Sequence, residues 1–105
     1  MKWLEMITLR ASGLCLENLV AQFISPLSEN IGKSGLCDIQ VYTLTGINTD
    51  LSIHIHWDTE RVSRQATLIG SCLAQTLEDY GLISHVTYMA QDLHRQSDKE
   101  QKNDR

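Results

Sequence analysis

Residues 51–58, with the sequence LSIHIHWD, alternate strictly between apolar and polar side chains. On a β-strand, positions two apart point to the same face. One face of this segment therefore carries an unbroken apolar row, and the other carries His54 and His56 between Ser52 and Asp58. The pattern predicts a strand with one face in the core and two of the chain's four histidines side by side on the opposite face.

Three further segments, residues 2–10, 36–44 and 83–90, alternate in the same way and predict three more strands. Residues 45–50, with the sequence TGINTD, have the composition of a turn. The strands on either side of this turn are therefore expected to form an antiparallel hairpin.

Two amphipathic helices are expected between these strands. Apolar residues recur at helical spacing from Leu16 to Leu27, and Pro26 predicts that this first helix is kinked or divided in two. The second helix is expected to begin between residues 60 and 64 and to end at Gly81, where a glycine commonly terminates a helix. The residues expected to cap its start are Asp58 or Thr59.

The order strand, helix, strand, strand, helix, strand predicts an α+β, ferredoxin-like βαββαβ fold. In that topology the first and third strands are central in a four-stranded antiparallel sheet, and both helices cover one face. The residues expected to face the helices are Leu51, Ile53, Ile55, Trp57, Leu4, Met6, Ile39, Val41, Val86 and Tyr88. The residues expected on the opposite face are Trp3, Glu5, Ile7, Leu9, Gln40, Tyr42, Leu44, His54, His56, His85, Thr87 and Met89.

This second set of residues is too apolar to lie open to water and too polar to form an ordinary core. Pairing of two sheets in a homodimer would cover it and leave a polar cavity between them. The sequence thus predicts that the protein's partner is a second copy of itself, with a small organic molecule as a further candidate ligand.

Length and charge narrow the candidate partners. The chain has 105 residues, with 42% hydrophobic and 21% charged residues and a net charge of −4. A single domain is expected over residues 1–94, followed by a polar and flexible tail over residues 95–105. The negative charge argues against nucleic acid as a partner.

Cys15, Cys37 and Cys72 are widely spaced in apolar contexts, so they are expected to be buried and reduced, as in a cytoplasmic protein. No segment approaches the ~20 apolar residues of a membrane span, and the first ten residues do not resemble a signal peptide. The expected location is therefore the cytoplasm, without membrane association.

Three segments carry a family resemblance: the first strand WLEMITLRA, the glycine that begins GLCDIQVYTL, and LSIHIHWDTE, a strand that ends in tryptophan and an acidic residue. Together with the helices between them, they resemble the dimeric α+β barrel superfamily, especially its branch of small proteins similar to antibiotic-biosynthesis monooxygenases. The resemblance covers residues 3 to about 92 and implies a homodimer whose two sheets form a barrel around or beside a pocket. Similar proteins include cofactor-free oxygenases and haem-degrading enzymes. The asparagine and aromatic pattern of haem degradation is not recognisable here, so no catalytic residues are carried over from those enzymes. No cofactor is expected.

Three histidines, His54, His56 and His85, fall on the same face in this arrangement. Three interpretations remain open. They can be polar packing at an interface, satisfied by neighbours such as Gln40 and Tyr42. They can bind a ligand or transfer protons, with His54 and His56 as the catalytic candidates and Glu5 setting an imidazole tautomer. Histidines with a carboxylate also suit a transition metal, but the His-x-His pair lacks a fixed third ligand, so no metal is assigned.

The ligand-binding candidates are Glu5, Tyr42, His85, Trp3 and Gln40. Two classes of function follow from them. One is a small cofactor-independent enzyme, a monooxygenase or isomerase acting on an aromatic or enolisable compound. The other is a non-catalytic ligand-binding or assembly protein whose sheet face is mainly a dimer interface. An RNA-recognition module of the same topology is disfavoured by Glu5, the histidines and the negative charge. A regulatory amino-acid-binding domain remains open, although such modules usually accompany a catalytic domain.

Overall fold

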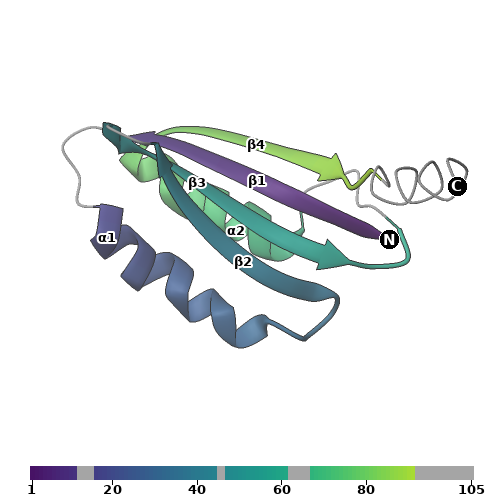
Figure 1. Ribbon diagram of the computed structural model, residues 1–105. Helices are drawn as coiled ribbons and strands as arrows, with labels where there is room; N and C mark the ends of the chain where they lie inside the picture. Colours follow the sequence, from purple (N-terminus) through teal and green to yellow (C-terminus); the bar gives the residue numbers. More distant parts are fainter. Residues whose placement is uncertain (12–15, 45–46, 62–66, 92–105) are drawn as a thin grey trace, which may run out of the picture.

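The computed structural model describes residues 1–11, 16–44, 47–61 and 67–91. The strands are β1 (Lys2–Ala11), β2 (Leu36–Leu44), β3 (Ile47–Asp58) and β4 (Gly81–Met89). The helical elements are α1 (Leu16–Leu19), η1 (Val20–Ile24), η2 (Ser25–Asn30), α2 (Leu68–Leu77) and η3 (Glu78–Tyr80). Figure 1 shows α2 behind the strands, with the opposite face of the sheet uncovered.

The four strands form one antiparallel sheet in the order β2-β3-β1-β4, so β1 and β3 are central. The run from α1 to η2 contacts β3 and β2, while α2 contacts β1 and β4. This is the α+β, ferredoxin-like arrangement that the order of elements predicted, and the prediction is confirmed.

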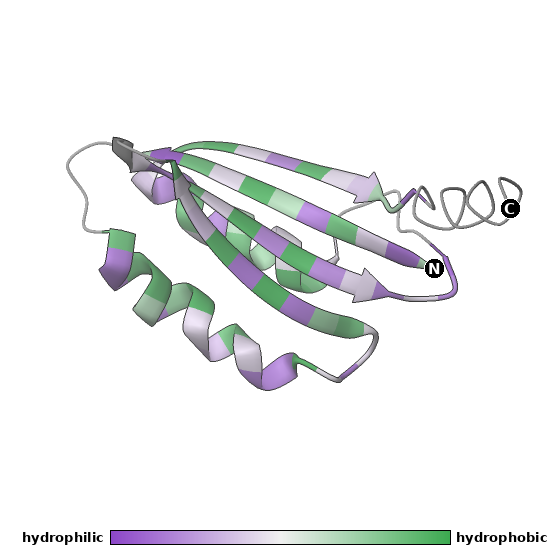
Figure 2. Ribbon diagram, in the orientation of Figure 1, coloured by the Kyte–Doolittle hydropathy of each residue, from purple (hydrophilic) through white to green (hydrophobic). Residues whose placement is uncertain are grey.

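The apolar row of β3 forms the centre of the core, as predicted. Leu51, Ile53, Ile55 and Trp57 are all buried against the helices. Ile39 and Val41 of β2 lie directly opposite Ile55 and Ile53, and residues paired in this way point to the same face. The alternating colours along the strands in Figure 2 reflect this division between a helix-covered face and an open one.

The prediction for β1 was wrong by one residue, which inverts the whole strand. Trp3 pairs with Trp57, Ile7 with Ile53 and Leu9 with Leu51, so the odd-numbered residues of β1 face the helices. Trp3, Glu5, Ile7 and Leu9 are buried, whereas Leu4 and Met6 lie half-buried on the open face. The physical reason is that Glu5, which suggested a solvated side, is buried with hydrogen-bond partners from distant segments.

The prediction for β4 was also inverted. His85 pairs with Ile7, and Thr87 pairs with Glu5, so both belong to the helix-covered face. Met89, which pairs with Trp3, shares this face, although its side chain is half exposed. Val86 and Tyr88, expected in the core, instead lie on the open face, and both side chains are exposed. Because β4 pairs only with β1, its orientation follows from that of β1.

The first helical segment is composite, as Pro26 predicted. An α-helical turn is followed by a π-helical stretch and then by a 3₁₀ helix in which Pro26 occupies the first turn. Proline is tolerated there because the first backbone N–H groups of a helix have no partner within it.

The second helix begins later than predicted. Thr67 is its N-cap, and its hydroxyl accepts a hydrogen bond from the Gly70 amide. The expectation that Asp58 or Thr59 caps this helix was wrong, because Asp58 is the last residue of β3 and accepts from the amino group of Met1. Residues 62–66, where the helix was expected to begin, lie outside the described residues. The helix passes through η3 and ends at Gly81, as predicted.

Cys37 and Cys72 are exposed, so the expectation that they are buried was wrong, and Cys15 lies outside the described residues. The boundary expected between residues 94 and 95 also lies outside them. Among the described helices, none is both long enough and apolar enough to span a membrane.

Candidate functional site

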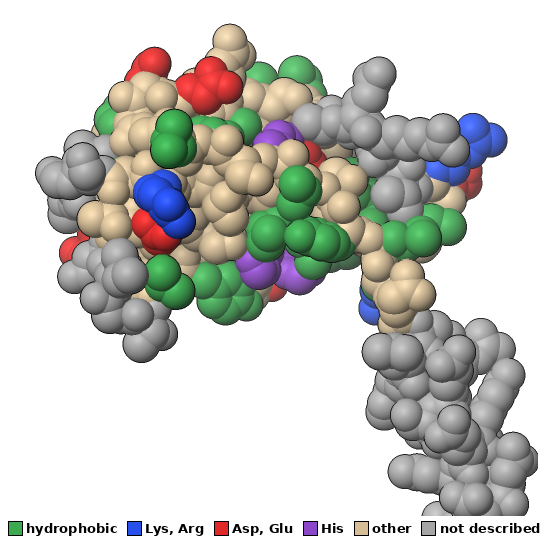
Figure 3. All heavy atoms as spheres, turned by 90° about the horizontal axis from the view of Figure 1, so that it is seen from above, with side chains coloured by type: hydrophobic (Ala, Val, Ile, Leu, Met, Phe, Trp, Pro, Cys, Tyr) green, Lys and Arg blue, Asp and Glu red, His purple; other side chains and the backbone are tan. Residues whose placement is uncertain are grey.

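The open sheet face is organised in rows that run across the strands, because paired residues lie side by side. One row consists of hydroxyl side chains and contains Ser84, Thr8, Ser52 and Tyr42. On one side of it lies the row Val86, Met6, His54 and Gln40, followed by the row Tyr88, Leu4, His56 and Asp38. On its other side lies the row Leu82, Arg10 and Asp50. We call these residues the open sheet face. Figure 3 shows hydrophobic side chains and two histidines gathered together on the molecule.

The apolar members of the open sheet face are unusually accessible. Tyr42 is 50% exposed, Tyr88 53% and Leu82 74%, and they come from both edge strands. By contrast, the histidines in the middle of the face are half-buried. The face thus places polar imidazoles within a border of exposed apolar and aromatic side chains.

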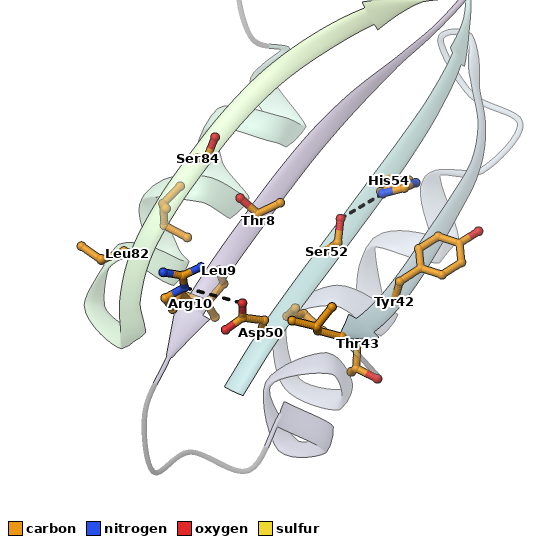
Figure 4. Close-up of a pocket in the computed structure, with 13 residues that line it drawn as sticks. Thr8, Leu9, Arg10, Tyr42, Thr43, Asp50, Ser52, His54, Leu82 and Ser84 are labelled. Atoms are coloured by element: carbon orange, nitrogen blue, oxygen red, sulfur yellow. Dashed lines mark hydrogen bonds and ion pairs between the residues drawn. The ribbon is translucent and has the colours of Figure 1, made fainter. Parts of the chain in front are cut away.

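A hollow of about 650 Å³ lies over one part of this face. Hydroxyl groups of Thr8, Ser52 and Ser84 lie along it, between Arg10 and Asp50 at one end and His54 at the other (Figure 4). A second hollow of about 740 Å³ is lined by residues that include His56, Gln40, Tyr42 and Tyr88. Both hollows are broad and open in a single chain, and both lie on the same side of the sheet.

His54 is held by its neighbours on this face. Its Nε2 lies 2.9 Å from Ser52 Oγ, and its ring centroid lies 4.7 Å from that of Tyr42. The His56 ring follows at 6.4 Å. Partial burial lowers the pKa of His54 below its ordinary value of 6.5, and the nearby charge of His56 lowers it further. Near neutral pH, His54 is therefore an uncharged imidazole that can accept a proton.

The lowered pKa of His54 makes folding stability depend on pH. The unfolded chain binds a proton at His54 more readily than the folded protein does. The stability associated with neutral His54 is therefore lost as the pH falls through the ordinary pKa of 6.5 towards the lower pKa of the folded protein. In a titration followed by NMR of the imidazole protons, His54 is expected to titrate below 6.5. In His56→Gln its pKa is expected to rise partly, because only the effect of burial remains. An unchanged His54 pKa in this variant would contradict the coupling between the two rings.

The β2 side of the face carries a carboxylate. Gln40 Nε2 donates to Asp38 Oδ2 at 2.5 Å, and the Ile39 amide donates to Asp38 Oδ1 at 2.8 Å. These hydrogen bonds, led by that from Gln40, hold the pKa of Asp38 below its ordinary value, and the charge of His56 adds a smaller effect. Asp38 therefore stays ionised beside His56, which lies directly opposite on β3.

Trp3, Glu5 and His85 do not belong to this site. They were predicted to share the face of His54 and His56, and the structure places all three on the helix-covered side. Glu5 is fully buried there, and His85 Nε2 lies 2.7 Å from Glu5 Oε2. The expectation that Glu5 orients an imidazole thus applies to His85, not to the pair on β3.

Glu5 is surrounded by donors from three other elements. Trp57 Nε1 donates to Oε1 at 2.9 Å, the Thr67 amide donates to Oε2 at 3.3 Å, and the Thr67 hydroxyl also donates to Oε1. Together with His85, these groups satisfy the carboxylate with protein donors. We call Glu5, Trp57, Thr67 and His85 the Glu5 cluster. Its contacts join β1, β3 and β4 to the start of α2, so its evident role is to fix that helix on the sheet.

Within the described parts of the chain, no group of three or more histidine, cysteine or acidic side chains is arranged to hold a metal ion. Among the described residues, His54 and His56 therefore have no third histidine, cysteine or acidic side chain placed to bind a metal ion with them. Polar residues of the first hollow that the sequence did not predict as site residues include Thr8, Arg10, Asp50 and Ser84. The alternation of β1 would have indicated Thr8 and Arg10 if its two faces had been assigned correctly.

No family model matches this sequence, and no curated protein matches it. Among solved structures, the chain is similar to the crystal structure of an ethyl tert-butyl ether D (EthD) family protein from Bacillus halodurans C-125. The TM-score is 0.56 at 17% sequence identity, and the match covers 85% of this chain and 99% of the other. The likeness establishes the fold.

Proposed function

We propose that two copies of this chain pair through their open sheet faces and bind a small organic molecule between them, next to His54. The observation that carries this proposal is the hollow beside His54, bounded by hydroxyl groups and set in a face that the helices leave uncovered. Binding pockets for small molecules typically combine apolar walls with a few convergent polar groups. Here Leu82 and Tyr42 provide the walls, and Ser52 and His54 provide the polar groups.

Exposed side chains support a second copy as the partner. Large apolar residues on both edge strands would be removed from water by a face-to-face contact, which favours association. The resemblance to dimeric barrels and the similar fold of the EthD family protein point to the same arrangement. Such pairing would also close the hollows, which are open in a single chain.

The chemistry that fits this pocket is proton transfer without a cofactor. Neutral His54 accepts a proton from an acidic C–H or O–H group of an aromatic or enolisable compound. Tyr42 packs against the imidazole ring of His54. Return of the proton at another carbon gives isomerisation. In the monooxygenase reaction, the carbanion adds O₂ and takes back the proton to form a hydroperoxide, which loses water to leave a new C=O group, so one oxygen atom enters the product and the other leaves as water. The second candidate is a non-catalytic barrel in which His54 and His56 serve the interface, favoured by the exposed Tyr88, which lies outside the first hollow.

Native mass spectrometry of the purified protein tests both parts of the proposal in one experiment. We expect a dimer that retains or takes up a small organic molecule. His54→Ala is expected to remain dimeric and to lose this ligand, since the polar group that contacts it is gone. If His54→Ala binds the ligand normally, the assigned role of His54 is wrong. If the variant instead dissociates into monomers, the interface function replaces the catalytic one.

The same measurement examines the interface with a matched pair of leucines. Leu82 lies on the open sheet face and is 74% exposed, whereas Leu68 lies on α2 and is 81% exposed. Leu82→Lys is expected to shift the protein towards monomer, because it buries a charge in the contact. Leu68→Lys is expected to leave the dimer intact. Equal behaviour of the two variants would show that the contact lies elsewhere.

A further inference from the structure

We infer that the hollow beside His54 selects ligands that carry a carboxylate, which Arg10 binds at the end opposite His54. This inference rests on the proposed function and adds the chemical class of the ligand. It depends on the state of the Arg10 guanidinium, the charges that line the hollow and the distance between its two ends.

The Arg10 side chain lies beside Asp50 and is mostly exposed. Its Nε lies 3.6 Å from Asp50 Oδ2, while the side chain as a whole is 76% exposed. No hydrogen bond joins its two terminal nitrogens to any described residue. These terminal N–H groups form the fork that binds a carboxylate with two parallel hydrogen bonds. Among the described residues, the contact with Asp50 thus leaves the anion-binding edge of Arg10 without a partner (Figure 4).

The charges around the hollow are few and clearly separated. Arg10 and Asp50 are the charged side chains among its described lining residues, and His54, at the other end, is neutral near pH 7. Asp50 is only 24% exposed, and it also accepts a hydrogen bond from Thr49 Oγ1 at 3.2 Å. The more accessible charge at this end is thus the positive one, on Arg10.

The spacing of the two ends limits the size of the ligand. Asp50, which pairs with Arg10, and His54 are four residues apart on β3, or about 13 Å between Cα atoms. A planar ring fits over the hydroxyls of Thr8, Ser52 and Ser84, with its carboxylate at Arg10 and an acidic hydroxyl group towards His54. A hydroxylated aromatic acid has this arrangement of groups.

Two probes of nearly equal shape distinguish the contribution of the carboxylate charge to binding from that of the ring. We would titrate the protein with 4-hydroxybenzoate and with its neutral amide, 4-hydroxybenzamide, and follow the backbone amides of residues 8, 52 and 84 by NMR. The wild-type protein is expected to bind the acid at least about tenfold more tightly than the amide, since hydrogen bonds to a charged group are stronger. Arg10→Gln is expected to abolish this preference while still binding the amide, which also shows that the variant is folded.

Arg61→Gln provides the control, because it removes the same charge from an exposed residue that lines neither hollow. It is expected to keep the preference for the acid. Equal affinity of the wild-type protein for both probes, or an unchanged preference in Arg10→Gln, would overturn the inference and leave the proposed function standing. If neither probe shifts residues 8, 52 and 84, the hollow does not take a hydroxylated aromatic acid and the inference is overturned, while native mass spectrometry still decides the proposed function.

Discussion

Replacement of Glu5 by alanine is expected to lower the free energy of unfolding by about 3–5 kcal/mol, since each buried donor that loses its acceptor costs about 1–3 kcal/mol. The side chain is fully buried and accepts hydrogen bonds from Trp57, Thr67 and His85. Without it, these donors face a cavity, and each unsatisfied group adds a penalty. Urea unfolding at one fixed protein concentration measures the change, since association also affects stability.

Glu5→Gln and Glu60→Ala complete this experiment. Glutamine keeps the shape of the side chain and one acceptor, but its NH₂ group would face a donor, so a smaller loss of about 1–3 kcal/mol is expected. Glu60 is exposed in the segment after β3, and its replacement should change stability very little. If Glu5→Ala unfolds within experimental error of the wild-type protein, the Glu5 cluster does not hold α2 on the sheet.

Gly70→Ala should also destabilise the protein, although glycine to alanine usually stabilises the interior of a helix by up to about 1 kcal/mol. A Cβ atom at this position would lie 2.8 Å from Cδ and 3.0 Å from Oε1 of Glu5, and closer still to Oε2. The carboxylate cannot move aside without giving up its hydrogen bonds, so α2 must shift. A loss of about 1–3 kcal/mol is expected, as for other overpacked sites.

Ser71→Ala is the matched control for this variant. Ser71 is the next residue of α2 and is exposed, so the substitution should give the small gain that helix propensity predicts. Thermal unfolding of the two variants should therefore move in opposite directions. A rise in melting temperature for Gly70→Ala would indicate that the helix does not pack as closely on Glu5 as described.

The strand pattern predicted the fold and the orientation of β3 correctly for a simple reason. The apolar face of β3 holds four large apolar residues without interruption, and its other face holds none. A segment of this kind has only one orientation in which its apolar surface is buried. The order of the elements and the handedness of their connections then leave few possible topologies.

The orientation of β1 could not be deduced in this way, because both of its faces are apolar. Trp3, Ile7 and Leu9 share a face with Glu5, and the opposite face offers Leu4 and Met6. The carboxylate suggested exposure, since an isolated charge is seldom buried. Its partners Trp57, Thr67 and His85 are 52, 62 and 80 positions away, so the local pattern carries no sign of them.

The candidate site was therefore predicted in part. His54, His56, Tyr42 and Gln40 lie together on the open sheet face, because β2 and β3 were oriented correctly. Trp3, Glu5 and His85 were assigned to it through the inverted orientations of β1 and β4. The same inversion hid Thr8, Arg10 and Ser84, which the expected arrangement directed towards the helices.

The central position of β1 has a consequence for how the chain folds. Residues of β1 pair with residues of β3 that are 40 to 56 positions away, and with residues of β4 that are 70 to 86 positions away. The β2–β3 hairpin and the α2–β4 unit are local and can form early, whereas β1 must close two long loops. The two local units share no strand pairing. We therefore expect β1, although it is synthesised first, to dock last and to join the two units in one cooperative step.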